Sequence, residues 1–545
     1  MYKNVLRLLT KGQRRQAYRV LLAVVVRALL DFAGVAALFP VLLMLLKPGS
    51  GRWEMLLLCG GVLLFVVAKN VLVCCLARIQ SRFQLEVYKD VSLRMFGNYY
   101  RRGLLFLKGK GSTRLSHEVN YTGYAFCQGI LASLFRLCGE GVLTALMLAA
   151  LFIWEPTAGI LLCAIFVSLS IGYVRLVRKR LQQYGTEEFE ARRRQARTVM
   201  ETFRGYAEIE IAHSFDSSLT NFVQGTEIIA TNRLRTEIWQ LLPLFLSETA
   251  IVLGMALLVV AGREDLGLSG GVFAIAAFRL VPAVRAMLNA YAVIQNSSQT
   301  LAVLTDGLDE RESETTKESV NFTFEKGIEL KNLGYAFPDG HLLFSGLNWH
   351  INRGERVGIR GASGSGKSTL FNLLLGFLKP TEGEIRIDGQ LLTPDNRMGW
   401  HQRVGYVPQE IFVMDGTLLE NIALGQSVPD RQKAQKVLEQ VQLGEWLAEL
   451  PEGLNTLLGE SGSRMSGGQK QRLGIARALY KEADVLFFDE ATSALDNRTE
   501  QEINRALQQL SASYQELTMI IIAHRESSLA LCDRIFDLEK QTEIV

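Results

Sequence analysis

The chain has 545 residues, of which 48% are hydrophobic and 21% are charged, and its formal net charge is +4. Soluble domains carry about 25% charged residues, so part of this chain is expected in an apolar environment. The composition excludes a disordered chain, a collagen-like repeat and a small disulfide scaffold. The positive surplus is too small to indicate a nucleic acid partner, so we expect none.

The cysteines and the N-terminus argue against a zinc site, a disulfide framework and a cleavable signal peptide. Seven cysteines are present, no two of them form a CxxC pair, and six fall in apolar stretches. This pattern predicts reduced, buried thiols and neither a zinc site nor a disulfide framework. The first apolar run is too long for the hydrophobic region of a cleavable signal peptide, so none is expected.

Six apolar segments in the first 300 residues are long enough to cross a bilayer, since a spanning helix needs about 20 mostly apolar residues. Their approximate bounds are 20–46, 55–77, 125–153, 157–177, 238–261 and 271–295. The two long links, 78–124 and 178–237, are rich in Arg and Lys, whereas the short links carry few charges. By the positive-inside rule, the N-terminus, both long links and the C-terminal half are cytoplasmic.

The long links show helical periodicity, as in Phe189–Phe203, and we interpret them as helices that continue the spans into the cytoplasm. A turn is expected in each link, near Ser112–Tyr121 and Tyr206–Phe215. These turns would contact the soluble half of the chain. The alternative is that they are plain surface loops.

Ionisable residues occur inside the predicted spans, where a charge is costly and therefore faces protein or a watery cavity. They are Arg27, Asp31, Lys69, Arg136, Glu140, Glu248, Arg279 and Arg285. One interpretation is structural pairing: Arg27 with Asp31 and Arg136 with Glu140 at i,i+4 spacing, and Arg279 with Glu248. The other is that the five basic residues bind an anionic head group in the cavity of a dimer.

After residue 300 the composition changes. Residues 301–326 form a polar, acidic linker, and 327–545 alternate β-rich and helical runs, which is typical of an α/β domain. Residues 361–369 read GASGSGKST and match G-x-x-x-x-G-K-[ST] between a strand-like and a helical run. The backbone of this loop binds phosphate oxygens, Lys367 reaches the β- and γ-phosphates, and the Ser368 hydroxyl ligates Mg²⁺. The candidate phosphate-binding residues are Gly361, Ser363, Gly364, Ser365, Gly366, Lys367, Ser368 and Thr369.

A second motif, Val485–Glu490, has four apolar residues followed by two carboxylates. This pattern predicts a buried strand that delivers two acids to the edge of a bound nucleotide. Asp489 would support Mg²⁺, and Glu490 would polarise the attacking water.

Residues Met465–Gln469 read MSGGQ and resemble the LSGGQ signature of ABC transporters, with Met in place of Leu. Gln409 within Val407–Gln409, Ser493–Asp496 and Ala523–Arg525 extend the resemblance. It implies that Gln409 senses Mg²⁺, that His524 holds the γ-phosphate and that Asp496 acts across a dimer interface. It also implies that Phe337 stacks on adenine, with Tyr335 as the fallback; the alternative is that Phe337 is a core aromatic residue. The signature residues that would complete a neighbouring chain's site are Ser466, Gly467, Gly468 and Gln469.

The expected architecture is an α-helical membrane domain of the ABC exporter type with six transmembrane helices, followed by an α/β P-loop nucleotide-binding domain. The expected domains are 1–300, a linker at 301–326, and 327–545. One nucleotide-binding domain makes half a transporter, so a second half-transporter chain is expected. The intact Glu490, His524 and signature favour a homodimer over a heterodimer.

The expected function is ATP hydrolysis coupled to transport, with ATP and Mg²⁺ as cofactors, in a bacterial inner membrane. Leu30–Val35 and Phe278–Val284 resemble the first and sixth spans of bacterial lipid-linked oligosaccharide flippases. The substrate implied is an anionic lipid-linked or glycolipid amphiphile. The alternatives are an exporter of peptides or other small amphiphiles and an ATP-gated channel or regulator; the intact Glu490 favours turnover over gating.

Overall fold

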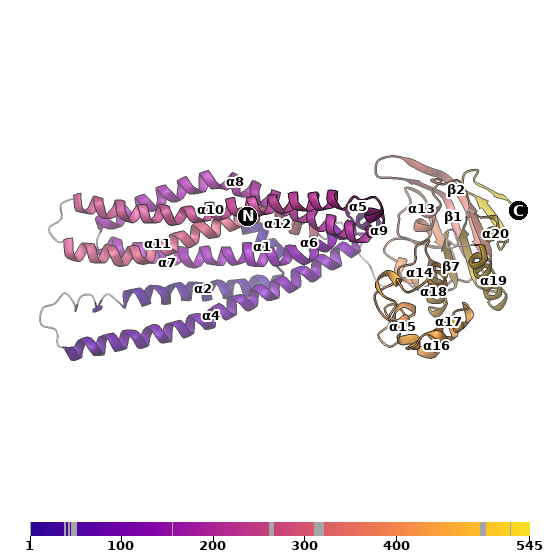
Figure 1. The fold of residues 1–545 in the computed structure, drawn as a ribbon, viewed down its shortest axis with the longest axis horizontal. Coiled ribbons are helices and arrows are strands. Elements are labelled where there is room, and N and C mark those ends of the chain that lie inside the picture. Colours follow the sequence, from indigo (N-terminus) through magenta and orange to yellow (C-terminus); the bar gives the residue numbers. More distant parts are fainter. Residues whose placement is uncertain are drawn as a thin grey trace. The chain divides into compact units, whose positions relative to one another are not determined.

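The computed structural model describes residues 2–37, 40–41, 44, 52–154, 156–260, 266–309, 321–490, 497–523 and 525–544. The chain divides into two compact units, Met1–Ser313 and Glu314–Val545. The first unit is helical and the second contains two β-sheets, as Figure 1 shows.

The first unit is a bundle of long helices that lie side by side (Figure 1). Its helices are α1 (Tyr2–Leu8), α2 (Lys11–Ala36), α4 (Arg52–Arg101), α5 (Gly103–Lys110), α6 (Ser112–Ala125), the π-helical segment η1 (Phe126–Leu131), α7 (Ala132–Trp154), α8 (Pro156–Arg204), α9 (Tyr206–Ile211), α10 (Phe215–Val260), α11 (Leu266–Asn296) and α12 (Ser298–Gly307).

Three of these helices are far longer than a bilayer requires: α4 has 50 residues, α8 has 49 and α10 has 46. At about 1.5 Å per residue each exceeds the hydrocarbon thickness of about 30 Å roughly twofold. Within the described residues, four stretches are long and apolar enough to cross a membrane: Trp53–Arg101, Ser112–Trp154, Phe215–Gly254 and Ala276–Asn296. The count of six spans therefore stays a prediction.

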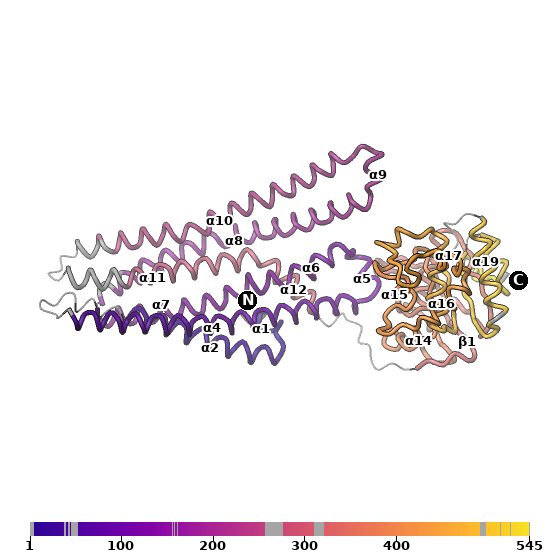
Figure 2. Tube along the Cα trace, turned by 60° about the horizontal axis from the view of Figure 1, so that its bottom comes forward, coloured from indigo at the N-terminus to yellow at the C-terminus, as the bar shows by residue number. Residues whose placement is uncertain are grey.

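Two helical hairpins end in short helices, and Figure 2 shows their tips apart from each other, at α5 and at α9. The prediction of the first turn near Ser112–Tyr121 was wrong, because Ser112–Ala125 is helix α6. The chain instead turns around α5, where Gly103 and Gly111 adopt φ of +77° and +76°. Only glycine adopts this left-handed conformation at low cost. The second turn lies where it was predicted, from α9 to Ser214.

Two apolar clusters fill the helical unit. Val20 and Val24 of α2 pack in one of them with Phe83 of α4 and Phe135 of α7. Ala28 of α2 belongs to the other cluster, together with Leu143 of α7 and residues of α8, α10 and α11. Two of the charged residues of α2, Arg27 and Asp31, lie within one helical turn of Ala28.

The second unit consists of two sheets and the helices around them. The strands are β1 (Gly327–Ala336), β2 (Leu342–Asn352), β3 (Arg356–Arg360), β4 (Glu382–Ile387), β5 (Gln390–Leu391), β6 (Val404–Val407), β7 (Val485–Asp489), β8 (Thr518–Ile522), β9 (Arg534–Asp537) and β10 (Thr542–Ile544). The helices are α13 (Lys367–Leu374), α14 (Arg397–Arg403), α15 (Leu418–Ile422), α16 (Arg431–Gln440), α17 (Gly444–Glu449), η3 (Gly453–Asn455), η4 (Glu460–Gly462), α18 (Gly467–Tyr480), α19 (Asn497–Ser513) and α20 (Glu526–Leu529).

The smaller sheet is antiparallel with the order β2-β1-β4-β5, and the larger has the order β10-β9-β3-β8-β7-β6. Strands β9, β3, β8, β7 and β6 are parallel to one another, and β10 pairs with β9 in the antiparallel direction. The first four residues of β7 are fully buried, as expected for a strand covered on both faces. Because carboxyl ends of parallel strands meet at one edge, the residues that follow β3, β7 and β8 come together there.

Candidate functional site

The loop 361–369 joins β3 to α13 at this carboxyl edge. Gly364 and Gly366 adopt φ of +85° and +97°, which turns the backbone sharply into the first turn of α13. A Cβ added to Gly366 would lie 2.7 Å from a methyl carbon of Leu343, so no other residue fits there without rearrangement. A glycine-rich loop that leads directly into the N-terminus of a helix is an arrangement that fits a phosphate group.

Lys367 begins α13 and is 5% exposed. Its Nζ donates hydrogen bonds of 2.8 Å to the carbonyl oxygens of Gly361 and Ala362, so the side chain folds back over the loop. Burial lowers the pKa of this ammonium group below its ordinary value. The side chain is held in the loop by acceptors that a phosphate oxygen could replace.

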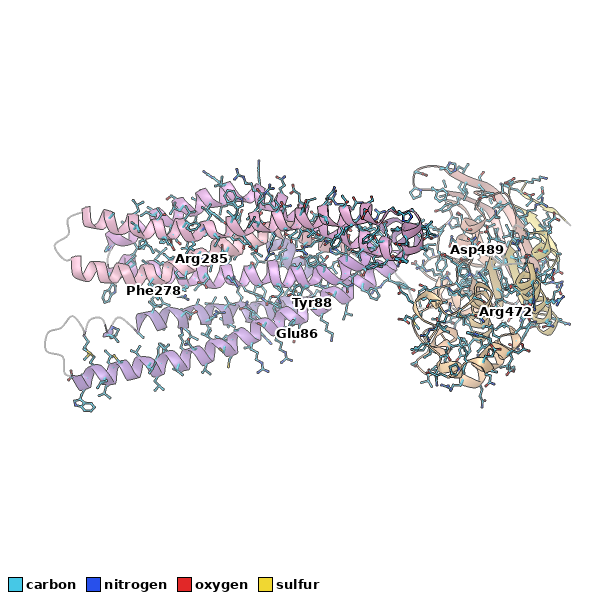
Figure 3. All side chains as sticks on the ribbon, in the orientation of Figure 1. Glu86, Tyr88, Phe278, Arg285, Arg472 and Asp489 are labelled. Atoms are coloured by element: carbon cyan, nitrogen blue, oxygen red, sulfur yellow. The ribbon has the colours of Figure 1, made fainter. Side chains whose placement is uncertain are left out.

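The Ser368 hydroxyl lies beside the end of β7. It donates to Oδ1 of Asp489 at 3.3 Å, and the Tyr406 hydroxyl donates to Oδ2 of the same carboxylate at 3.4 Å. Figure 3 labels Asp489 in this domain. A hydroxyl and a carboxylate side by side supply the oxygen ligands that Mg²⁺ prefers, so these residues fit a nucleotide-bound Mg²⁺. Burial, and after it the neighbouring carboxylate of Asp489, raises the pKa of Tyr406 above its ordinary value.

Glu490 follows β7 in a left-handed backbone conformation, with φ of +49°. Its N–H donates to the carbonyl oxygen of Ile522 in β8 at 3.0 Å, which fixes the turn. Its Oε2 accepts a hydrogen bond of 3.0 Å from Nε2 of Gln409. The structure therefore brings Glu490 and Gln409, which are distant in the sequence, into direct contact.

The signature turn begins helix α18. The Ser466 hydroxyl accepts from the N–H of Gln469 at 3.2 Å, and Oε1 of Gln469 accepts from the N–H of Ser466 at 2.8 Å, which makes a reciprocal cap. Gly467 and Gly468 are its first helical residues. Met465 is 8% exposed and belongs to the apolar core, so Met in place of Leu keeps an apolar anchor of similar volume.

Among the described residues, no hydrogen bond or ion pair joins the signature turn to the loop 361–369 of the same chain. The link that exists is indirect. Gln471 of α18, which is 6% exposed, donates from Nε2 to the carbonyl oxygen of Gln409 at 2.8 Å. The signature helix thus positions Gln409 and, through it, contacts Glu490.

Phe337 and Tyr335 differ in their accessibility. Tyr335 is 3% exposed and lies in the core, whereas Phe337 is partly buried at the edge of that core. The two rings meet edge to face with centroids 5.4 Å apart, and the Phe337 ring stacks on His341. Of the two, only Phe337 is partly exposed.

Asp496 and His524 lie outside the described residues, but their neighbours are bound together. Glu500 of α19 is 4% exposed. Its carboxylate pairs with Arg525 and accepts hydrogen bonds from the hydroxyls of Ser527 and Ser528. Arg525, Ser527 and Ser528, which follow His524 in the sequence, therefore contact Glu500 of α19, the helix that follows Asp496.

We expect Glu500→Gln to lower the free energy of unfolding by about 1–2 kcal/mol at pH 7, because the bonds to a charged group are lost. Burial alone would raise the pKa of Glu500, but the bonds from Ser527 and Arg525 outweigh it and hold the pKa below its ordinary value. The stabilisation is thus present above about pH 4.3 and disappears as pH falls through the folded-state pKa. Thermal unfolding across pH measures this difference, with exposed Glu516→Gln as the control; a difference that grows on acidification would contradict it.

Three residues at the site were missed by sequence analysis: Tyr406, Gln471 and Glu539. The Glu539 carboxylate accepts a hydrogen bond of 2.8 Å from the N–H of Ala362 in the phosphate loop. Each of the three reaches the site from a segment remote in sequence from the partner it holds. Two of them lie beside a motif in the sequence: Gln471 is two residues beyond the signature, and Tyr406 directly precedes Val407–Gln409.

In the helical unit, three basic residues surround one carboxylate. Asp31 of α2 accepts from Nζ of Lys69 in α4 at 2.9 Å, lies 3.6 Å from the guanidinium of Arg279 in α11, and lies 4.0 Å from that of Arg27. Arg279 is therefore paired with Asp31, and the alternative of a pair with Glu248 was wrong. Glu248 is exposed and makes no ion pair among the described residues.

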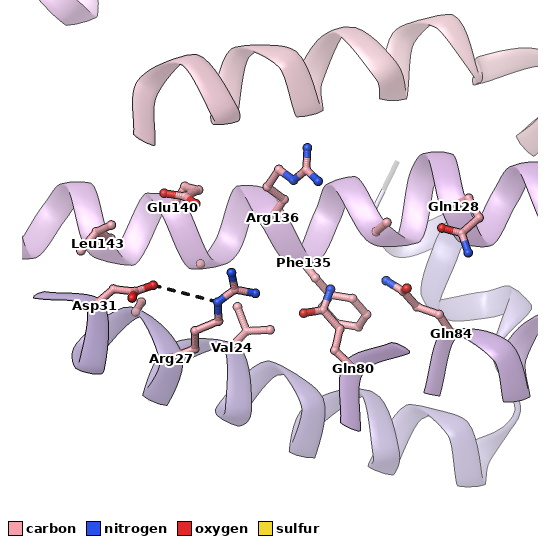
Figure 4. Close-up of a pocket in the computed structure, with 13 residues that line it drawn as sticks. Val24, Arg27, Asp31, Gln80, Gln84, Gln128, Phe135, Arg136, Glu140 and Leu143 are labelled. Atoms are coloured by element: carbon pink, nitrogen blue, oxygen red, sulfur yellow. Dashed lines mark ion pairs between the residues drawn. The ribbon is translucent and has the colours of Figure 1, made fainter. Parts of the chain in front are cut away.

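The other predicted pair on α7 is not formed either. Arg136 and Glu140 have no contact within 4.0 Å in the described part of the chain, and Figure 4 shows their side chains apart. Arg136 is exposed. Arg285, labelled in Figure 3 on α11, is half-buried and lies outside the Asp31 group. The structure thus gathers Arg27, Lys69 and Arg279, but it does not join all five predicted basic residues.

Comparison with known proteins agrees with this geometry. Residues 344–493 match the family profile described as "ABC transporter". The structure of a bacterial Atm1-family ABC exporter with ATP bound aligns with 96% of this chain and 94% of that chain, with a TM-score of 0.83 and 21% identity, which is a likeness of fold. The protein is a half-transporter with the ABC exporter fold: an integral membrane protein with an ATP-binding domain, and an ATP-hydrolysing transporter.

Relatives over most of the chain are named ATP-dependent lipid A-core flippase. The protein of Burkholderia pseudomallei (strain 1710b) is 28% identical over 83% of this chain and 77% of its own length. That of Burkholderia orbicola (strain AU 1054) is 27% identical over 96% and 90%. An uncharacterised ABC transporter ATP-binding protein of Bacillus subtilis (strain 168) is 41% identical over 38% of this chain and 36% of its own length.

Proposed function

We propose that this protein is an ATP-driven flippase or exporter of an anionic glycolipid or lipid-linked glycan in a bacterial inner membrane. The observation that carries the proposal is the group of three basic side chains on the single carboxylate of Asp31, inside an apolar helical bundle. The lipid A-core flippases that resemble the chain over most of its length support the same substrate class.

The basic surplus favours an anionic substrate. Among the described residues in this part of the bundle, four basic side chains face two carboxylates, Asp31 and Glu140, which leaves a surplus of two positive charges. The basic residues are Arg27, Lys69, Arg136 and Arg279. An uncompensated charge among apolar helices is costly, so it needs a counter-ion. A phosphate or carboxylate head group would supply one, while its acyl chains remain against the apolar surface. Arg285 would extend this surface along α11.

In the ATP-binding domain, the loop 361–369 would hold the phosphates through backbone N–H groups, and Lys367 would exchange its carbonyl acceptors for phosphate oxygens. Ser368, Asp489 and Gln409 would hold Mg²⁺. Glu490 would orient and polarise the attacking water, His524 would hold the γ-phosphate, and Phe337 would stack on adenine. Because the long links are basic, the domain would lie in the cytoplasm.

A second chain would complete each site. The signature residues Ser466–Gln469 make no hydrogen bond or ion pair with the phosphate loop of their own chain among the described residues. The N–H groups of Gly467 and Gly468, at the start of α18, and the donor hydrogen of the Ser466 hydroxyl would therefore serve another copy. Asp496 would contact the partner at the same interface. Since every ATP-site motif is intact, a homodimer is favoured.

Mixed dimers test this sharing. We expect Lys367→Ala and Ser466→Ala homodimers to lose hydrolysis at least tenfold, whereas a dimer of one Lys367→Ala chain and one Ser466→Ala chain keeps one intact composite site. Two affinity tags isolate the mixed dimer for ATPase measurement. A mixed dimer as inactive as both parents, or full activity in a monomer, would contradict the shared site.

The substrate class is tested with the purified protein in phosphatidylcholine proteoliposomes. ATPase activity is measured with added phosphorylated glycolipid, phosphatidic acid, neutral glycolipid or a cationic peptide. We expect the phosphorylated glycolipid to stimulate hydrolysis most and to be moved between leaflets only with ATP. Stimulation by the peptide alone would instead indicate a peptide exporter, and ATP-dependent ion current without lipid movement would indicate a channel.

A further inference from the structure

A polar cavity of about 280 Å³ lies within one chain between α2, α4, η1 and α7. Figure 4 shows the side chains that line it, which include Gln80 and Gln84 of α4 and Gln128 of η1. The volume is near the lower end of the about 300–1,000 Å³ that small-molecule sites occupy. Phe135 of α7 forms an apolar part of the wall and is 6% exposed.

The cavity contains polar atoms without partners. Gln84 is only 7% exposed, and its Nε2 has no hydrogen-bond partner. Oε2 of Glu140 is also buried without one. A buried amide donor that lacks a partner costs about 1–3 kcal/mol, so it is retained where a ligand or water satisfies it. Gln128 lies in a π-helical turn, a distortion that is frequent at functional sites.

The charges of the lining residues balance. The lining contains two cations, Arg27 and Arg136, and two carboxylates, Asp31 and Glu140, and three glutamine side chains complete the polar surface. Carboxylates without surplus cations repel a phosphate group. A sugar hydroxyl is both a donor and an acceptor, and so are amide groups and mixed Arg–carboxylate pairs. The cavity, with its equal numbers of positive and negative side chains, therefore matches hydroxyl groups. Lys69 and Arg279, the surplus cations that attract a phosphate, contact Asp31 but do not line the cavity.

We propose that this cavity is a head-group subsite that binds one neutral sugar ring of the transported lipid. The proposal rests on the proposed function for the identity of the lipid, but sugar binding itself is a property of this cavity. Gln84 hydrogen-bonds a hydroxyl at the floor, and Gln128 and Arg136, which are exposed, stand at the rim. Phe135 offers an apolar face to the C–H side of the ring. Asp31 connects the sugar subsite to the basic group that attracts the phosphate.

The test measures lipid binding to the full chain in phosphatidylcholine nanodiscs by native mass spectrometry. The probes are monoglucosyl diacylglycerol and phosphatidic acid with identical acyl chains. We expect Gln84→Leu to weaken binding of the glucosyl lipid about tenfold and to leave phosphatidic acid binding unchanged. Because Leu removes an unpartnered buried amide, the melting temperature should equal or exceed that of the parent. Gln183→Leu, at an exposed position on α8, is the matched control and should change neither.

Ala132→Leu provides a second variant, because Ala132 lines the cavity and a larger side chain there occupies the space of the sugar. It should reproduce the loss of glucosyl lipid binding without removing a polar group. Parent-like glucosyl lipid binding in both variants would overturn the proposal and show that the cavity holds water only. Equal loss of both lipids would also overturn it, since the site would not then discriminate sugar from phosphate.

The two proposals fail separately. If no lipid stimulates ATPase activity but the glucosyl lipid binds in a Gln84-dependent manner, the sugar subsite stands and the flippase function is wrong. If phosphorylated glycolipid stimulates ATPase equally in the parent and in Gln84→Leu, and the glucosyl lipid binds both alike, the flippase function stands and the subsite is wrong.

Discussion

Replacing Glu490 with Gln should reduce ATP hydrolysis by about a hundredfold or more, within the range that a positioned general base contributes. The substitution keeps the shape of the side chain but removes the carboxylate that polarises water. The Oε1 of the new Gln can still accept from Nε2 of Gln409, which donates to Glu490 at 3.0 Å. The loop 361–369 is untouched, so ATP affinity should remain within about threefold of the parent.

The measurement pairs steady-state ATPase activity with equilibrium nucleotide binding on the full chain. Glu482→Gln is the matched control, because Glu482 is an exposed residue paired with Lys433 at 2.7 Å, on the surface of the same domain. It should hydrolyse ATP at the parent rate. Hydrolysis near the parent rate in Glu490→Gln would show that another group activates the water.

The candidate ATP site could be described from the sequence because its functional groups lie in short contiguous motifs. Gly366 must be glycine for its φ of +97°, and the buried run Val485–Phe488 must end at the carboxyl edge where Asp489 stands. These requirements concern single residues or short segments, so they can be recognised in the sequence itself. Tyr406, Gln471 and Glu539 were missed because their positions depend on tertiary contacts between segments far apart in the chain.

The membrane charges illustrate a different limit. Depth along a helix can be counted from the sequence, and depth alone made Glu248 the natural partner of Arg279. The direction in which a side chain points around the helix axis cannot be deduced in this way when the helix is apolar on most of its surface. The structure turns Glu248 outward and Arg279 toward Asp31 of α2. Similarly, glycines alone mark the turn around α5, since the basic residues of that link are compatible with helix throughout.

Replacing Asp31 with Asn should destabilise the helical unit by about 3 kcal/mol, the lower end of the cost of breaking a buried ion pair. Asp31 and Lys69 are 19% and 13% exposed at their side chains, so solvent screens their attraction little. Without the carboxylate, Lys69, Arg279 and Arg27 repel one another with no anion between them. The expected result is a lower melting temperature and a lower yield of folded protein in detergent.

Arg279→Ala should behave differently, because Asp31 keeps its 2.9 Å bond to Lys69. We expect it to fold with a melting temperature near that of the parent and to keep basal ATPase activity, but to lose most of the stimulation by phosphorylated glycolipid. Glu248→Gln is the control for both variants: its exposed side chain makes no ion pair among the described residues, so stability and stimulation should be unchanged.

Further variants test whether the carboxylate of Asp31 organises the basic group of Arg27, Lys69 and Arg279. In Asp31→Asn combined with Lys69→Met, one of the three repelling cations is removed, so part of the lost stability should return. If Asp31→Asn were as stable as the parent while Arg279→Ala failed to fold, Arg279 would be a packing residue and Asp31 would not organise the basic group. If instead Glu248→Gln lost stability and Arg279→Ala lost it equally, the pairing seen between Arg279 and Asp31 would not be the one that holds α11 in the folded protein.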